Sequence, residues 1–159
     1  MLVLRRSITE LCVVDHHNDR TTLEEWLRNK TAEDFRSWLE ARSSFCVVTE
    51  SDDKVNGVGL LNRDGEIQLC YVTPEVEGQG FGSAILTALE NKAKTWGLLK
   101  LHLESTASAR AFYEKQGYIS VGASKCGFGV SRCFPYEKSL QTNRTVASDG
   151  RKDGARGSP

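Results

Sequence analysis

Glycine recurs at every second position within YVTPEVEGQGFGSAILTALE, residues 71–90. Gly78, Gly80 and Gly82 would let the backbone approach a ligand closely. Apolar residues at helical spacing begin directly afterwards, so the loop amides lie at a predicted helix N-terminus. Free N–H donors and the helix dipole favour an anion there, typically a phosphate. Ser83 stands where a dinucleotide fingerprint needs glycine, and the Gly-Lys-Ser/Thr of a P-loop is absent. Alone, the loop is equally compatible with a flexible strand-to-helix turn.

A second chemically equipped stretch is LESTASARAFYEKQGY, residues 103–118. Glu104 ends a predicted strand, Thr106 or Ser108 begins a predicted helix, and that helix carries the phenol of Tyr113. On helical pattern alone, Tyr113 is expected to pack beside Phe112 against a sheet.

Two further polar groups could take part in chemistry. Glu66 follows the Asp64-Gly65 turn, where the simpler interpretation is a solvated glutamate. The segment DHHND, residues 15–19, suggests metal binding or catalysis, but acidic and histidine residues at a helix end are usually caps or solvated. We therefore predict no metal.

Composition places the chain among ordinary soluble domains. It has 159 residues, of which 39% are hydrophobic and 26% charged, and its 21 basic and 21 acidic side chains balance. Neutral charge gives no electrostatic reason to expect nucleic acid or an anionic membrane as a partner. The sequence shows neither a secretory signal nor a long apolar run, and the five cysteines lack zinc or disulfide spacing. A cytoplasmic location with reduced thiols is expected.

The elements that must position these residues follow from periodicity. Residues 3–14 have an amphipathic helical pattern, and two short helices capped by Thr21 or Thr22 and by Thr31 follow. Strands are predicted at 45–49, 55–61 and 66–72, a helix from the glycine loop to Gly97, a strand at 98–104, a helix ending at Gly117, and strands near 118–122 and 129–138. In the third strand, alternation places Ile67, Leu69 and Tyr71 on one face.

The last residues differ in composition from the rest. Residues 141–159 contain Val146 as their one large apolar side chain, so burial cannot offset the entropy of ordering them. We expect one domain over residues 1–140 and a disordered polar tail over 141–159.

In this order, the elements over about residues 44–138 resemble the GNAT superfamily of N-acetyltransferases. YVTPEVEGQGFGSAILTALE is similar to the superfamily's acetyl-CoA loop, and LESTASARAFYEKQGY to its Tyr-bearing helix. The N-terminal segment also resembles a bacterial GNAT group without an assigned substrate. The resemblance implies an α/β fold with a mixed, mainly antiparallel sheet flanked by helices, in which the fourth and fifth strands splay apart around the cofactor.

The resemblance also implies roles for individual residues. Tyr113 would protonate the departing CoA thiolate, and Glu66 is a candidate base acting through water. Asp15 and His16, with Glu104, are candidates for contacting the acceptor amine. Cofactor contacts are expected from the backbone of a strand end, from the loop amides and from one hydroxyl: Tyr71, Val72, Thr73, Gly78, Gln79, Gly80, Phe81, Gly82, Ser83 and Thr106.

The sequence departs from the family pattern at three places. Glu77 replaces the usual Gln or Arg at the start of the loop, which would oppose a pyrophosphate unless the carboxylate faces solvent. Thr106 stands where an asparagine often contacts pantetheine. Residues 1–3 are too short for the family's first edge strand, and loss of that strand would expose a sheet edge that a second copy could cover as a homodimer.

These observations predict acetyl transfer from acetyl-CoA, with no metal, to a small-molecule or peptide amine. The alternative is a CoA-binding regulatory module with weakened or lost catalysis, suggested by Glu77 and the short N-terminus.

Overall fold

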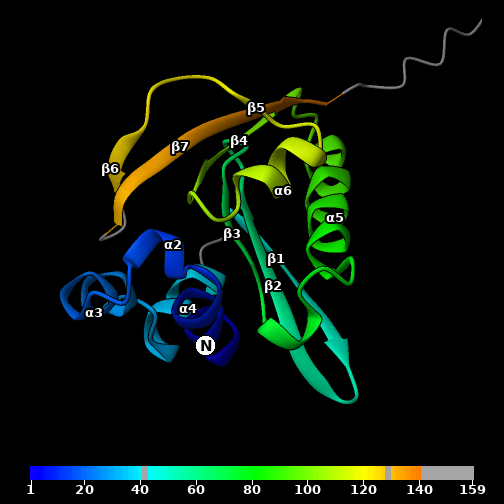
Figure 1. The fold of residues 1–159 in the computed structure, drawn as a ribbon. Coiled ribbons are helices and arrows are strands. Elements are labelled where there is room, and N and C mark those ends of the chain that lie inside the picture. The colour runs from blue at the N-terminus through cyan, green and yellow to red at the C-terminus, as the bar shows by residue number, and fades with distance from the viewer. Residues whose placement is uncertain (41–42, 128–129, 141–159) are drawn as a thin grey trace, which may run out of the picture.

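The computed structural model describes residues 1–40, 43–127 and 130–140. Helices form the first quarter of the chain, and strands with two further helices form the rest (Figure 1). The N-terminal elements are α1 (Leu2–Arg6), the π-helical turn η1 (Ser7–Leu11), α2 (Val13–His16), α3 (Arg20–Leu27) and α4 (Ala32–Glu40). No helix in the described part of the chain is long and apolar enough to span a membrane.

The predicted amphipathic helix at 3–14 is present but changes its winding at η1. The caps of the next two helices differ in origin. Asp19, not a threonine, caps α3 by accepting a hydrogen bond from the Thr22 N–H, because its carboxylate is one residue ahead of the helix. Thr31 caps α4 as predicted, and its Oγ1 accepts from the Asp34 N–H at 3.1 Å.

The first sheet is an antiparallel meander in the order β1-β2-β3, formed by β1 (Ser44–Ser51), β2 (Lys54–Asn62) and β3 (Ile67–Val72). It begins after four helices, and β1 is its edge strand. Pairing of this edge with a second copy stays a prediction.

A bulge between Leu60 and Leu61 shifts the register of β2 against β3. Because each extra residue reverses the alternation of side chains, Ile67 packs in the same cluster as Leu61, while Leu69 packs with Leu60 in another. The residues of the predicted common face thus divide in packing: Leu69 and Tyr71 belong to the second cluster, and Ile67 belongs to the first.

The second sheet has the order β4-β7-β5, with β4 (Lys100–Ser105), β5 (Ile119–Ser120) and β7 (Val130–Ser139) all antiparallel. A short strand that the sequence did not predict, β6 (Lys125–Gly127), pairs with β7. Helix α6 (Arg110–Lys115) begins later than predicted, after the turn that follows β4.

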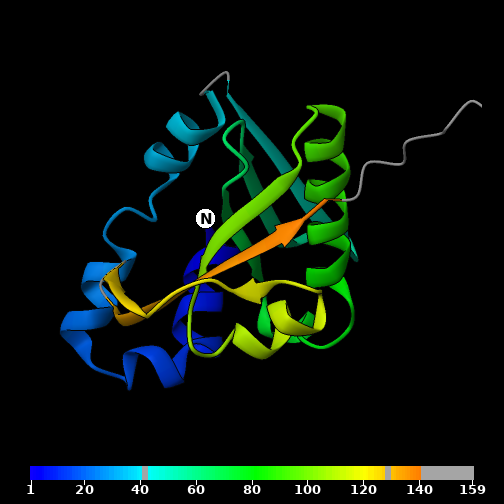
Figure 2. The same ribbon diagram turned by 90° about the horizontal axis from the view of Figure 1, so that it is seen from above.

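Helix α5 (Phe81–Thr95) and the N-terminal helices lie on opposite sides of the strands (Figures 1 and 2). On the α5 side, Ile85, Leu86 and Leu89 are buried in the main core. On the other side, Val3 and Leu4 pack against strand residues of the first sheet. Each face of the first sheet is thus covered by one helical layer.

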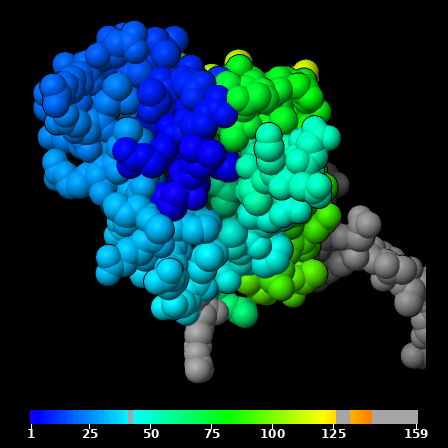
Figure 3. Space-filling model, turned by 90° about the horizontal axis from the view of Figure 1, so that it is seen from below, coloured from blue at the N-terminus to red at the C-terminus, as the bar shows by residue number. Residues whose placement is uncertain are grey.

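The 3-10 turn η2 (Pro74–Val76) lies beside the first helices, as Figure 3 shows on one face of the molecule. Arg6 Nη1 is 2.6 Å from Glu75 Oε1 and links the two segments. The predicted disordered tail from Gln141 onward lies outside the described residues, so the domain boundary at residue 140 stays a prediction.

Candidate active site

The two sheets meet where β3 and β4 begin side by side. Glu66 and His102 form a parallel bridge, and the His102 N–H donates to the Gly65 carbonyl at 2.9 Å. Beyond that point the described residues of β3 pair with β2 and those of β4 with β7. β3 and β4 therefore separate after the Glu66–His102 bridge, and their facing edges keep backbone groups that a ligand can pair with.

The free edge of β3 is set by its pairing with β2. The Thr73 N–H donates to the Asn56 carbonyl at 2.8 Å, so it is already used. Backbone groups alternate in direction along a strand, which turns those of Tyr71 toward β2 as well and those of Cys70 and Val72 toward the gap. Of the three residues expected to pair with pantetheine, Val72 is the one whose backbone faces the gap.

The glycine loop presents free donors at the N-terminus of α5. Gly80 precedes the helix with φ 89°, and no side chain caps the helix. Among the described residues, no acceptor is found for the N–H groups of Gly80, Phe81, Gly82 and Ser83. Space above Gly80 is open, because a Cβ there would meet no atom within 4 Å. The loop therefore offers a cluster of amides with room for an anion.

The side chains of the loop face other partners. The Gln79 amide donates to the Glu75 carbonyl, and Ser83 Oγ accepts from Gln116 Nε2 at 2.9 Å, which ties the start of α5 to the end of α6. Glu77 is exposed and forms no ion pair in the part of the chain that the structure describes. An anion at this loop would thus be held by backbone rather than side chains.

Tyr113 of α6 is buried, and its phenol interacts electrostatically with the thiol of Cys70 on β3. Burial raises the pKa of this phenol well above its ordinary value near 10. The ring also packs edge-on against Phe112, as the helical pattern suggested. The side chain therefore combines packing with a hydroxyl beside the strand whose backbone faces the gap.

A cleft of about 240 Å³ opens between the N-terminal helices and the β3–β4 junction. Four of the predicted site residues line it together: Glu66, Tyr71, Glu104 and Thr106. Glu66 Oε2 accepts from Asn62 Nδ2 at 2.9 Å and from Gln68 Nε2 at 3.3 Å. The remaining lining residues are mostly aromatic, aliphatic or amide-bearing, with one lysine: Trp26, Asn29, Lys30, Trp38, Leu60, Ile67, Gln68 and Leu69.

Glu104 has an unusual environment in this cleft. Its Oε1 lies 3.5 Å from Lys125 Nζ, but Oε2 is buried and has no hydrogen-bond partner within residues 1–40, 43–127 and 130–140. An unpartnered carboxylate oxygen is costly to bury, so it is expected to gain a donor from a water or a ligand.

Asp15 and His16 do not line the cleft, and their predicted role beside the amine stays a prediction. Both are buried, and both have protein partners. The Asp15 carboxylate accepts from the N–H groups of Ala107 at 2.5 Å and Ser108 at 3.2 Å, and from Ser108 Oγ at 2.6 Å. His16 Nδ1 accepts from the Asn18 N–H at 3.0 Å, so Nε2 carries the proton that it shares with a carbonyl of η1. These side chains fasten α2 to the loop after β4 and to the first helices.

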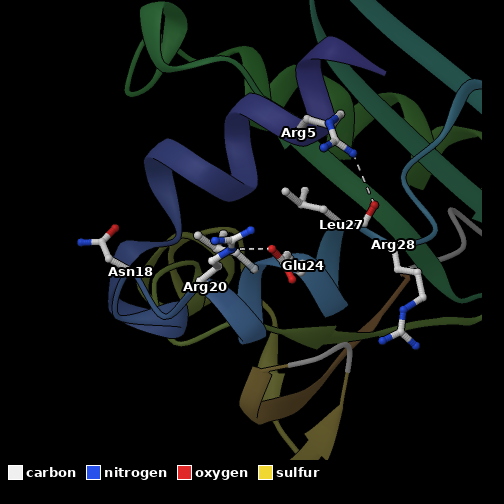
Figure 4. Close-up of a pocket in the computed structure, with 7 residues that line it drawn as sticks. Arg5, Asn18, Arg20, Glu24, Leu27 and Arg28 are labelled. Carbon is white, nitrogen blue, oxygen red and sulfur yellow. Dashed lines mark hydrogen bonds and ion pairs between the residues drawn. The ribbon is translucent and has the colours of Figure 1, made fainter.

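Another hollow, of about 410 Å³, is lined by residues of α3 together with Arg5 of α1 and Asn18 (Figure 4). Its arginines have protein partners: Arg5 Nη1 donates to the Leu27 carbonyl at 3.4 Å, and Arg20 pairs with Glu24 at 2.7 Å. The predicted site residues do not line this hollow. Within the described residues, no group of three or more His, Cys, Asp or Glu side chains is arranged to hold a metal.

The model of the acetyltransferase (GNAT) domain matches residues 13–140, most of the chain. The chain belongs to the GNAT acetyltransferase family. A search of curated proteins gives no significant match.

Solved GNAT structures share the fold. A GCN5-related N-acetyltransferase from Rhodopseudomonas palustris superposes with a TM-score of 0.77 at 22% identity, over 87% of this chain and 86% of that one. The PaiA N-acetyltransferase from Thermoplasma acidophilum, in complex with coenzyme A, gives 0.69 at 20% identity, over 87% and 91%. An aminoglycoside 6′-N-acetyltransferase complexed with coenzyme A gives 0.62 at 14% identity, over 80% and 96%. The predicted GNAT fold is confirmed.

Proposed function

We propose that this GNAT protein transfers an acetyl group from acetyl-CoA directly to an amine. The observations that carry the proposal are the free amides at the start of α5 and the cleft at the β3–β4 junction, which Glu66 and Glu104 line. A thioester held in the gap would lie between an anion site and an acceptor site. Coenzyme A in two of the structural neighbours supports this choice of co-substrate.

The residues present fit coenzyme A at both ends of the gap. Of the loop amides predicted from Gly78 through Ser83, the free ones from Gly80 to Ser83 would bind the pyrophosphate, as helix N-termini do, because the Gln79 N–H donates to the Val76 carbonyl. Backbone groups of Val72 would pair with pantetheine as a neighbouring strand would. Thr106 Oγ1 would accept one further hydrogen bond, because Ser108 Oγ donates to Asp15 and the Thr106 hydroxyl therefore donates to Ser108 Oγ. Exposed Glu77 can turn toward solvent, where its charge is screened.

The acceptor amine would enter from the cleft. Glu104 Oε2 lacks a partner, so it is our choice to receive N–H donors of the amine, and Glu66 is our candidate to take the proton through water. The amine nitrogen attacks the thioester carbonyl, an N–C bond forms, and the C–S bond breaks. The electron pair leaves with the sulfur, which Tyr113 then protonates from its hydroxyl.

Steady-state release of free CoA thiol, measured with a panel of amines, tests this proposal. Tyr113→Phe should lower kcat by ~10²–10⁴-fold with nearly constant acetyl-CoA affinity, because general acid catalysis contributes on that scale. Glu104→Gln should raise KM for the amine. Two variants serve as matched controls: Tyr118→Phe, which loses a hydroxyl from the same aromatic cluster, and Glu50→Gln, at an exposed position of β1.

Two results would contradict the proposal. Full activity in Tyr113→Phe would remove the assigned general acid, leaving Tyr113 as a packing residue. Binding of CoA without turnover of any amine would favour the regulatory module.

A further inference from the structure

Lys30 is a buried cation in the helical wall of the cleft. Only 6% of the residue is exposed, and it follows α3 at the point where the chain turns toward α4. Its Nζ lies 2.5 Å from Asn29 Oδ1 and 5.6 Å from the centroid of the Trp38 ring. No carboxylate of the described residues lies within ion-pair distance of it.

The described residues around the Lys30 ammonium do not provide acceptors for all of its N–H donors. An ammonium has three N–H donors, of which Asn29 accepts one and the face of Trp38 can accept another. Burial lowers the pKa of Lys30, against the weaker opposing effect of Asp34. The Asp34 carboxylate is itself occupied, since it accepts from Thr31 Oγ1 at 2.6 Å. A buried charge in this state is stabilised by an anionic partner.

Charges in the cleft have a definite arrangement. The carboxylates of Glu66 and Glu104 come from the strand side, and the ammonium of Lys30 from the helix side. Aromatic and aliphatic side chains, among them Trp26 and Tyr71, line the space with them. A ligand that complements this cleft has an amine at one end, an anionic group at the other and an apolar body between.

We propose that the acceptor is an amine that also carries a carboxylate, and that Lys30 binds this carboxylate while the ammonium faces Glu104. The assignment of the amine end rests on the proposed function. A carboxylate fits better than a phosphate dianion, because one lysine without arginines supplies a single charge and few donors.

The test compares two probes that differ only in charge at one end, 4-(aminomethyl)benzoate and 4-(aminomethyl)benzamide. Quenching of tryptophan fluorescence reports binding, since Trp26 and Trp38 line the cleft and Trp96 packs elsewhere, against Phe45. With coenzyme A present, the parent protein should bind the benzoate about tenfold or more tightly, the scale of one charge-assisted hydrogen bond. Lys30→Met, which keeps the aliphatic stem, should bring the affinity ratio close to one.

Two variants serve as controls. Lys30→Arg keeps the charge and should retain part of the preference, and Lys94→Met, at an exposed position of α5, should retain all of it. Equal binding of the two probes by the parent, or an unchanged ratio in Lys30→Met, would overturn the inference. Release of CoA thiol with the same probes is measured in parallel. Selective binding without thiol release would support the Lys30 site and count against acetyl transfer, so the two proposals can fail separately.

Discussion

Replacing Asp15 by alanine should loosen the connection between the N-terminal helices and the loop after β4. The buried carboxylate accepts two backbone N–H bonds, from Ala107 and Ser108, and one from Ser108 Oγ. Hydrogen bonds to a charged group contribute ~1.5–3 kcal/mol each, but they are not additive, and Ser108 is exposed enough for water to replace part of the loss. We expect the free energy of unfolding to fall by about 3 kcal/mol.

The same change should weaken cofactor binding, because the loop held by Asp15 carries Thr106 at the edge of the cleft. Urea denaturation measures the stability, and calorimetry measures CoA affinity. Asp15→Asn keeps one carbonyl acceptor and should lose about half as much stability. Asp64→Ala, in the exposed hairpin turn, is the matched control and should change neither quantity.

Unchanged stability and CoA affinity in Asp15→Ala, with a higher KM for the amine, would refute this reasoning. That pattern would place the carboxylate beside the acceptor, as the sequence had suggested.

Two further predictions concern the glycine loop and the phenol. Gly80→Ala should lower the free energy of unfolding by ~1 kcal/mol, because φ is 89° there while space for the Cβ is open. Calorimetry should also show weaker CoA binding, because the methyl group projects beside the free amides. Unchanged CoA affinity would exclude the loop as the phosphate site. Burial raises the pKa of Tyr113, so the phenol keeps its proton as pH rises. The kcat should therefore not fall on the alkaline side up to about pH 10, the ordinary phenol pKa. A fall in kcat below that pH in the parent, absent from Tyr113→Phe, would contradict the prediction.

Local sequence patterns determined most of the secondary structure. The alternation and turn residues of 45–72 predict the meander, because strands joined by short turns pair with their neighbours. The glycine loop and the helix after it are equally local, since a helix start leaves its first N–H groups free whatever packs around it. Membership of the GNAT family was therefore evident from residues close together in the chain.

Register and partners depended on the tertiary structure. The bulge beside Leu61 turns Ile67 away from Leu69, and alternation in the sequence contains no signal for it because both faces of the sheet are apolar. Asp15 was expected beside the substrate, yet it holds Ser108, 93 residues away. The sequence pattern of an aspartate at a helix end does not distinguish a carboxylate that binds a ligand from one that binds a distant loop.

The cleft shows most clearly which features depend on the local sequence and which depend on the tertiary structure. Lys30, Glu66 and Glu104 come from a helix connection and two strands, and they line one space because the N-terminal helices fold back onto the junction of two sheets. Glu66 and Glu104 were separate candidates in the sequence, whereas no sequence pattern singled out Lys30. Burial, and the absence of a neighbouring carboxylate among the described residues, are properties of packing. Backbone chemistry at the cofactor loop is determined locally, whereas the charges offered to the acceptor depend on which distant segments meet.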